Sequence, residues 1–430
     1  MASEATALTG AAVALKEPAG VRWGSLSLLA LIIFSGLLMQ GSLGSIQETV
    51  KLELGLTDFQ TSLIQGLAVS IPVALLAIPL GRLTDRGNRM RLLVIMALVW
   101  TIGTALTAFA QGFAALFLAR VLANIGAVLA IPIVISLGAD LSPPAQRGRA
   151  LLPMSLGKIA GQAAAIALGG AVVTALAARP ALTGGFSPWR AMHLVFAGVS
   201  LLLLLPLLTA KEPARHETGE QASPPFRAAM GEIWQRRDLL VPLFIGQVTV
   251  VMADFAALSW SSTVLIRDYG QQPADYSNWL GAVILFSGIF GSLIGGVAAD
   301  LGHRSRMKRG ILIGAVAAAL LSIPGAFFPI MPTATGFAIM LALLALCGTV
   351  TGLVTATALA VLIPNEIRGV CLGAFMVVGS VIGLGVAPTM ATGIAGLMGG
   401  EAYLRYGLTI TTVITSLIAA FGFLRAMRRG

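Results

Sequence analysis

The chain has very few charged residues for its length. Only 11% of its 430 residues are Asp, Glu, Lys or Arg, whereas 57% are hydrophobic and the mean hydropathy is +0.90. A water-soluble globular protein of this length does not tolerate such a composition. Twelve membrane spans of about 22 residues each would use about 264 residues, which leaves no room for a soluble catalytic domain. The composition therefore predicts an integral membrane protein and excludes a soluble enzyme.

Cysteine is also scarce, and both copies, Cys347 and Cys371, lie in apolar stretches. Two such residues support neither a disulfide framework nor a metal site. Sequence motifs for zinc binding, for phosphate or dinucleotide binding and for the nucleophile elbow of hydrolases are absent as well. We therefore expect no cofactor, no metal and no ATP hydrolysis.

Acidic residues are outnumbered, with 18 Asp and Glu against 28 Lys and Arg and a net charge of +10. In a soluble protein this excess would point to nucleic acid. In a membrane protein with many spans, Lys and Arg first serve to hold cytoplasmic loops in place. We therefore expect no nucleic-acid partner.

The apolar residues form twelve long runs. The run that begins at residue 23 is too long for a signal-peptide core, so we interpret it as the first span. With both termini in the cytoplasm, the outer loops hold only five of the basic residues, as the preference of Lys and Arg for cytoplasmic loops requires. We predict spans near residues 23–47, 59–80, 92–110, 113–138, 150–178, 190–210, 239–267, 277–300, 310–328, 333–362, 370–398 and 405–425.

Two loops half a chain apart share a pattern. Residues 81–91 and residues 296–306 agree at five positions with an offset of 215, and a weaker Arg-Gly echo occurs at Arg147 and Arg368. Such a parallel repeat is typical of transporters that bind substrate between their two halves. We predict a cytoplasmic tail at residues 1–22, six-helix bundles at 23–210 and 239–425, a cytoplasmic linker at 211–238 and a cytoplasmic tail at 426–430.

The motif Gly-x-x-x-Asp-Arg-x-x-Arg after the second span resembles the signature loop of the major facilitator superfamily. Residues 56–60, 116–120, 189–190, 260–267 and 382–388 are similar to the spinster-like bacterial branch of that superfamily. The resemblance implies an all-α membrane protein of twelve transmembrane helices in two six-helix bundles, with a central cavity and alternating access. It also implies a latch at the cytoplasmic helix ends, the alternative being basic loops that only set topology. The latch residues would be Gly81, Asp85, Arg86, Arg89, Asp300 and Arg304, together with Arg147 and Arg368.

Two positions depart from the spinster-like pattern. This branch usually carries an Asp-Arg pair in span one and a glutamate seven residues after an arginine in span four. Here the corresponding positions are Met39-Gln40 and Ala127. Because that glutamate is the suspected proton carrier of the branch, proton coupling in this chain needs a different residue.

Three ionisable side chains lie within the predicted spans, namely Arg120, Lys158 and Asp254. A charge near the bilayer centre costs about 2.5 to 3.5 kcal/mol on insertion scales, so each is a functional candidate. Polar residues accompany them at helical spacing, which indicates one polar face on each helix. We predict proton coupling by Asp254 and substrate binding by Arg120, Lys158, Gln40, Asn124, Gln162 and Gln247.

Each charged residue has a structural alternative. Arg120 can donate hydrogen bonds to backbone carbonyls within the first bundle. The stem of Lys158 can reach towards the cytoplasmic interface. Asp254 can be the permanent ion-pair partner of one of the two cations.

Together these features predict a secondary transporter. Two cations against one anion favour an anionic group on the substrate, and the apolar lining favours an organic body, as in a small organic acid or an amphipathic lipid-like anion. The alternatives are an uncoupled facilitator and, from a different class, a non-transporting membrane receptor. An intramembrane enzyme lacks a convergent acid, base and nucleophile. We expect a monomer in the bacterial inner membrane, with protons and membrane lipids as further partners.

Overall fold

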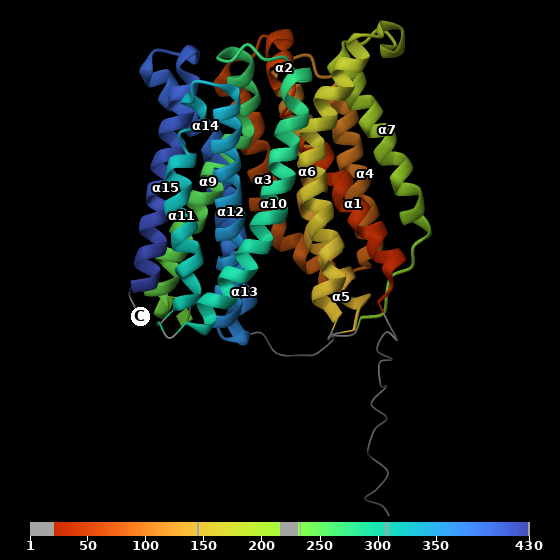
Figure 1. Cartoon of the computed structure of the whole chain (residues 1–430). Helices are drawn as coiled ribbons and strands as arrows, with labels where there is room; N and C mark the ends of the chain where they lie inside the picture. Colours follow the sequence, from red (N-terminus) through yellow and green to blue (C-terminus); the bar gives the residue numbers. More distant parts are fainter. Residues whose placement is uncertain are drawn as a thin grey trace, which may run out of the picture.

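The computed structural model describes residues 21–143, 146–215, 231–232, 234–305, 307 and 309–428, without the side chains of residues 85, 147, 365–370 and 372. Within this part of the chain all regular structure is helical, and twelve helical spans are long and apolar enough to cross a membrane (Figure 1). This confirms the predicted all-α membrane protein with twelve spans. The helices are α1 (Trp23–Gly41), α2 (Gln47–Leu54), α3 (Asp58–Arg86), α4 (Arg89–Ala108), α5 (Phe113–Asp140), α6 (Arg147–Ala177), α7 (Pro188–Thr209), α9 (Arg237–Arg267), α10 (Pro273–Arg304), α11 (Ile313–Gly325), α12 (Ala334–Leu362), α13 (Asn365–Val378), α14 (Gly385–Met398) and α15 (Leu404–Arg428).

Several helices begin at residues that satisfy the free N–H groups of a first turn. The Thr57 hydroxyl accepts a hydrogen bond from the Gln60 backbone N–H at 3.1 Å, and the Gln60 side chain accepts one from the Thr57 N–H at 3.0 Å. At α4 the Asn88 side chain accepts a hydrogen bond from the Arg91 N–H, and at α12 the Thr333 hydroxyl accepts one from the Gly336 N–H. Each of these polar capping residues directly precedes an apolar helix. The N-termini of the helices therefore lie where the membrane boundary is expected.

The first span is shorter than predicted. Helix α1 ends at Gly41, a turn follows at residues 42–46, and α2 is a separate short helix. Gln40 and Gln47 therefore lie on two different helices. The eleventh span is also interrupted, because a π-helical turn at Gly379–Leu384 separates α13 from α14. Hydropathy averaged over a whole span does not detect such local breaks.

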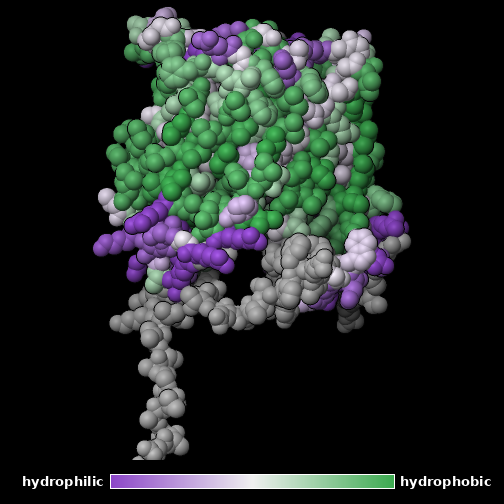
Figure 2. All heavy atoms as spheres, turned by 180° about the vertical axis from the view of Figure 1, so that it is seen from behind, coloured by the Kyte–Doolittle hydropathy of each residue, from purple (hydrophilic) through white to green (hydrophobic). Residues whose placement is uncertain are grey.

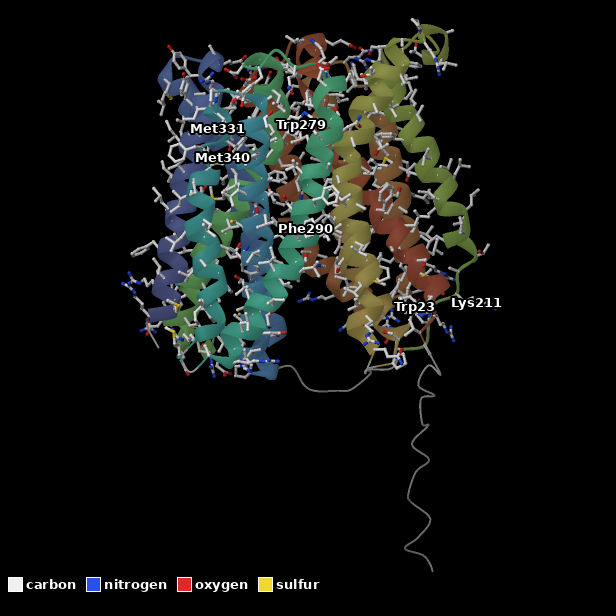
Figure 3. The ribbon with its side chains drawn as sticks, viewed as in Figure 1. Trp23, Lys211, Trp279, Phe290, Met331 and Met340 are labelled. Atoms are coloured by element: carbon white, nitrogen blue, oxygen red, sulfur yellow. The ribbon has the colours of Figure 1, made fainter. Side chains whose placement is uncertain are left out.

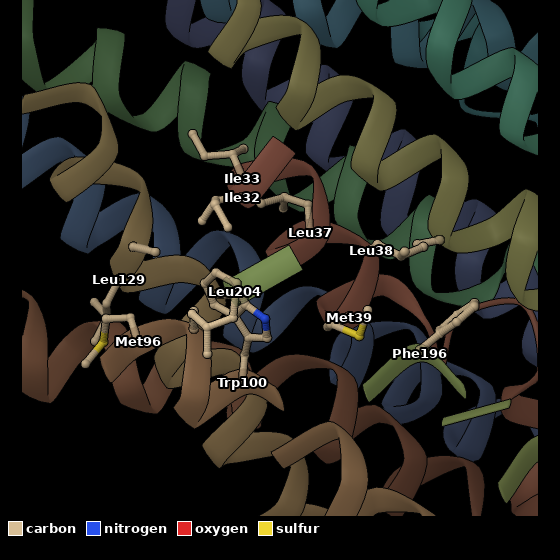
Figure 4. Close-up of a cluster of buried hydrophobic side chains, with 14 of the residues drawn as sticks. Ile32, Ile33, Leu37, Leu38, Met39, Met96, Trp100, Leu129, Phe196 and Leu204 are labelled. Carbon is tan, nitrogen blue, oxygen red and sulfur yellow. The ribbon is translucent and has the colours of Figure 1, made fainter. Parts of the chain in front are cut away.

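Each half of the chain buries its own hydrophobic core. In the first half, α1, α4, α5 and α7 pack around Ile32, Met39, Trp100, Leu129 and Phe196 (Figure 4). In the second half, two clusters join α9, α10, α11, α12, α14 and α15, and one of them also includes Ile166 of α6. The structure therefore has the two six-helix bundles that the repeat predicts.

The two bundles meet along two seams of small residues. One seam joins α3 to α14, where Gly66 packs directly against the backbone of Gly385. A Cβ added at Gly66 would lie 2.6 Å from the Gly385 carbonyl oxygen. The other seam joins α6 to α10, where Gly281 packs against Ala163 and Ala167. Glycine is required at Gly66 because no larger residue fits between the two backbones.

The molecule has a hydrophobic band between two polar ends. Figure 2 shows hydrophobic atoms around the middle and hydrophilic atoms gathered at both ends. Trp23 and Lys211 lie at one end, and Trp279 and Met331 lie towards the other (Figure 3). We call the first the terminal end, because α1 begins and α15 ends there, and the second the α2 end (Figure 1). The termini of the helical core thus share one side, and its assignment to the cytoplasm stays a prediction.

Candidate functional site

A cavity of about 580 Å³ lies between the two bundles. Helix α6 contributes its wall from the first bundle, and α9, α10 and α12 contribute from the second. Most of the lining is aliphatic, with polar side chains from Ser155, Lys158, Gln162, Asp254, Ser261, Ser287, Ser292 and Thr349. A cavity of this size, with an apolar wall and a few convergent polar groups, is typical of small-molecule binding sites.

Lys158 supplies a cation to this cavity. Its side chain is exposed there, on the same face of α6 as Ser155 and Gln162. Within the described part of the chain, no hydrogen bond or ion pair reaches its ammonium group. An ammonium group has three donors and no acceptor, so an anion in the cavity would find a charged partner that is not already engaged.

Asp254 lies on α9, on the opposite side of the cavity from α6. Its Oδ1 atom is buried and has no hydrogen-bond partner among the described residues. No described Lys or Arg forms an ion pair with it, so the structure does not show the permanent pairing with Arg120 or Lys158 that was considered as an alternative. A carboxylate in this position is available to bind a cation.

Arg120 is buried in the first bundle and bonded to backbone. Its guanidinium donates to the carbonyl oxygens of Met39, at 3.2 Å, and Gln40, and lies 3.5 Å from the Ser42 hydroxyl. These carbonyls belong to the last turn of α1, where a helix leaves its C=O groups without partners and carries a partial negative charge. Arg120 thus stabilises the C-terminal end of α1. This is the structural alternative to substrate binding that the sequence left open for Arg120.

Replacing Arg120 should destabilise the protein more than replacing Lys158. In Arg120→Gln, at least one buried carbonyl loses its donor, which costs about 1–3 kcal/mol. We expect a lower thermal unfolding midpoint in detergent for this variant, and an unchanged midpoint for Lys158→Gln. Equal midpoints for the two variants would contradict the structural role of Arg120.

A smaller chamber of about 60 Å³ adjoins the main cavity and shares Gln162, Phe255 and Leu258 with it. Gln40, Arg120 and Asn124 also line it. Asn124 is 1% exposed and its Oδ1 atom has no partner among the described residues. The structure therefore brings together five of the predicted binding residues, Gln40, Arg120, Asn124, Lys158 and Gln162, around two connected spaces.

Gln247 does not belong with them. Its side chain is buried between α9 and α12, where its Oε1 accepts a hydrogen bond from the Thr355 hydroxyl at 3.0 Å. Neither the main cavity nor the chamber includes it. The polar spacing along α9 predicted one face for Gln247 and Asp254, but a partner on α12 accounts for Gln247.

A cluster of charged residues closes the α2 end, and it is not among the residues predicted from the sequence. Arg267 on α9 donates to Glu48 at 2.8 and 2.9 Å and to both oxygens of Asp58 at 2.7 Å. Lys51 donates to Asp58 at 2.7 Å and also to Glu401. We call these five residues the α2-end network. Glu48, Lys51 and Asp58 belong to the first bundle and Arg267 and Glu401 to the second, so the network joins the bundles.

Neutral hydrogen bonds reinforce this closure. Ser262 donates to the Gly44 carbonyl at 2.5 Å, and the Tyr276 hydroxyl donates to the Ser45 carbonyl at 2.7 Å. Every ion pair between the bundles that involves described side chains on both sides lies at the α2 end. The signal for this network was present in residues 56–60 and 260–267, which contain Asp58 and Arg267 and were used only for the resemblance.

The predicted latch residues lie at the terminal end, in different surroundings. Gly81, Arg86, Asp300 and Arg304 are exposed. The side chains of Asp85, Arg147 and Arg368 lie outside the described residues. The latch therefore stays a prediction.

Arg89 is the buried member of this group. It donates to Asp140 at 2.5 Å, to the Ser136 hydroxyl at 3.0 Å and to Glu212 at 3.1 Å. Arg215 donates to the carbonyls of Thr84 and Gly87 at 3.0 and 2.6 Å. These contacts hold the loop after α3 and the segment after α7 against the first bundle.

A family model described as Major Facilitator Superfamily matches residues 28–388. The chain belongs to the major facilitator superfamily. It is a multi-pass membrane transporter and not an enzyme, as the sequence predicted. The fold of this superfamily member is similar to that of a bacterial homologue of the human lysosomal transporter Spinster in its inward-facing, occupied conformation. The TM-score is 0.79 at 21% identity, covering 95% of this chain and 97% of the other. The resemblance to the spinster-like branch is thus confirmed at the level of fold.

Two curated transporters are similar in sequence. The 3-(3-hydroxy-phenyl)propionate transporter of Escherichia coli (strain K12) is 28% identical over 211 residues, 49% of this chain and 48% of that protein, so this match spans about half the relative's length. A protein named probable 4-methylmuconolactone transporter, from Cupriavidus pinatubonensis (strain JMP 134 / LMG 1197), is 25% identical over 342 residues. That match covers 77% of this chain and 75% of the relative.

Proposed function

We propose that this transporter carries a small organic acid by alternating access, as a secondary transporter that is coupled to a cation. The observation that carries the proposal is Lys158: its charged group is exposed in a cavity of about 580 Å³ between the bundles and has no partner among the described residues. A carboxylate of the substrate would form a charge-assisted hydrogen bond with it.

The aliphatic wall and Phe255 suit the organic body of such an acid. The names of both curated relatives refer to small compounds of this kind, which supports a small acid over a lipid-like anion. We propose that Gln162 and, in the adjoining chamber, Gln40 and Asn124 bind polar groups of the same substrate.

We further propose that the α2 end faces outwards and that the structure represents the inward-facing state. The ion pairs at the α2 end then form the outer gate, and both termini and the linker at residues 211–238 lie in the cytoplasm of a bacterial cell. The asymmetry of basic residues among the loops supports this orientation.

Binding to purified full-length protein tests the proposed substrate class. We expect 3-(3-hydroxyphenyl)propionate or a similar aryl or unsaturated acid to bind, and its uncharged methyl ester to bind at least tenfold more weakly. A lysophospholipid serves as the lipid-like competitor. If the lysophospholipid binds and none of the small acids does, the proposal of a small-acid substrate is wrong.

Asp254→Asn should separate coupling from substrate movement. A carboxylate can take up and release a cation during alternating access, whereas an amide cannot. In sodium-free proteoliposomes, we expect the variant to lose accumulation driven by a pH gradient and to keep substrate exchange down its own gradient. Accumulation equal to wild type would exclude Asp254 as the coupling residue, whereas no accumulation by the wild type itself would favour an uncoupled facilitator or another driving ion.

A further inference from the structure

A third, much smaller cavity lies within the second bundle. Its volume is about 10 Å³, and α9, α11, α12 and α15 line it. Asp254 and Leu344 line both this cavity and the main cavity, and Asp254 is the charged one of the two. Four of the lining residues carry side-chain oxygens, namely Asp254, Ser322, Thr351 and Ser416.

Two of these oxygens have no partner among the described residues. They are Oδ1 of Asp254 and Oγ of Ser416, and Ser416 is only 2% exposed. A buried polar atom without a hydrogen bond costs about 1–3 kcal/mol. Two such atoms on different helices, at one cavity, indicate that the protein binds something there.

The hydroxyl groups of Thr351 and Ser322 already donate their protons to backbone carbonyls. Thr351 donates to the Gly348 carbonyl and Ser322 donates to the Ala319 carbonyl, both at 2.8 Å. The lone pairs that remain on these hydroxyls can only accept a hydrogen bond or coordinate a cation. Together with the carboxylate, they make the cavity rich in acceptors.

Size and charge restrict what can occupy it. An anion is excluded by the carboxylate, and a water molecule needs about 10–15 Å³, so the space is at the lower limit for water. One carboxylate neutralises one monovalent cation, whereas a divalent ion would leave an unpaired charge in the bundle. Oxygen ligands suit hard cations.

We propose that Asp254, Ser416, Thr351 and Ser322 bind a sodium ion. This inference rests on the proposed function in one respect, because it makes sodium the cation that is coupled to substrate movement through Asp254. Asp254 lines both cavities, so its carboxylate is placed to respond to the sodium site and to the substrate. Sodium and a proton then compete for one carboxylate, and sodium affinity falls as the pH is lowered.

Few other ionisable groups face this carboxylate. Cys347 on α12 lies beside it in the small cavity, and Lys158 on α6 faces it from the main cavity. The described residues of α11 and α15 that line the small cavity supply hydroxyls only, and α10 supplies Ser287 and Ser292 to the main cavity. Lys158→Gln should therefore raise sodium affinity modestly, because it removes a like charge.

Gly348 provides a second way to change the site. A Cβ at this position would overlap the carboxylate of Asp254, so Gly348→Ala must displace that carboxylate. Gly352 lies on the same helix, four residues later, and there a Cβ would make an ordinary contact at 3.7 Å with Gln247. Gly352→Ala is the matched control for helix propensity and volume.

The experiment measures binding of ²²Na⁺ to purified full-length protein in choline buffer without substrate. We expect saturable binding to wild type, loss in Asp254→Asn, and affinity at least tenfold weaker in Ser416→Ala and Gly348→Ala. Ser45→Ala and Gly352→Ala should bind as wild type does, because Ser45 is also a buried serine without a described partner but lines none of the three cavities.

Two results would overturn the sodium site: no saturable binding to wild type, or wild-type affinity in both Ser416→Ala and Gly348→Ala. If Ser416→Ala does not fold, Thr351→Val replaces it with the same expectation. Binding of the organic acid in choline buffer is measured in parallel. If the acid binds although sodium does not, the sodium site is wrong and the proposed substrate class stands. If the acid does not bind, the proposed substrate class is contradicted whatever the sodium result.

Discussion

Arg267→Gln is expected to open the α2 end of the transporter. Arg267 donates four hydrogen bonds to Glu48 and Asp58 across the bundle interface, and the Asp58 side chain is only 4% exposed. Removing one member of a buried ion-pair cluster leaves carboxylates without their cation, which costs about 3–5 kcal/mol. This cost falls only on the closed state, so about 3 kcal/mol would raise the ratio of open to closed molecules about 100-fold.

Spin-label distances across the α2 end provide the measurement. Leu52 on α2 and Leu397 on α14 belong to different bundles and are 72% and 91% exposed, so Cys introduced at these positions can carry labels. The native Cys347 and Cys371 are buried. We expect a longer distance between the two labels in Arg267→Gln than in the parent.

Arg190→Gln is the matched control. Arg190 also forms an ion pair near the α2 end, with Glu53 at 2.9 Å, but both residues belong to the first bundle. Burial opposes ionisation of Glu53, yet hydrogen bonds from Arg190 and Trp189 outweigh it and hold its pKa below the usual value. The label distance should not change in this control. If Arg267→Gln and Arg190→Gln give the same distances as the parent, the α2-end network is not a gate.

Lys158→Gln is expected to weaken substrate binding by about 10- to 100-fold, since a hydrogen bond to a charged group contributes about 1.5–3 kcal/mol. Glutamine keeps a hydrogen-bond donor of similar reach but removes the charge. Calorimetry or ligand-fluorescence titration with the organic acid on purified protein measures the change. Lys158→Arg keeps the charge and should recover part of the affinity.

Lys211→Gln controls for the loss of one positive charge from the whole protein. Lys211 lies at the terminal end, away from the cavity (Figure 3). We expect wild-type affinity in this variant. Wild-type affinity in a folded Lys158→Gln protein would exclude Lys158 as the residue that binds the anion.

Much of the fold was predictable because membrane insertion imposes long-range rules on the sequence. Span length and apolar composition predict the twelve helices, and the repeated loops predict the two bundles. The break after Gly41 was not predictable in the same way. Its free carbonyls are satisfied by Arg120, which is distant in sequence, so only the packed structure shows why the chain can leave the helix there.

Some residues of the candidate site were also predictable from the sequence, whereas others were evident only in the packed structure. Lys158 and Asp254 were identifiable because a charge inside a span is costly and therefore noticeable. Arg120 was equally noticeable, but its bonding to α1 is visible only in three dimensions. Arg267 was overlooked because a basic residue at a span end is ordinary in a membrane protein, and its acidic partners lie more than 200 positions away.

The two seams of small residues separate two properties of the transporter. Along α3–α14 and α6–α10 the bundles approach each other closely at positions such as Gly66 and Gly281. Because glycine has no side chain, rotation of one bundle against the other requires no change of rotamer at these two positions. The rate of the transport cycle then depends mainly on the packing of side chains along these two seams. The preferred resting state depends instead on the polar contacts at the α2 end and the terminal end. Substitutions can alter either property while leaving the other in place.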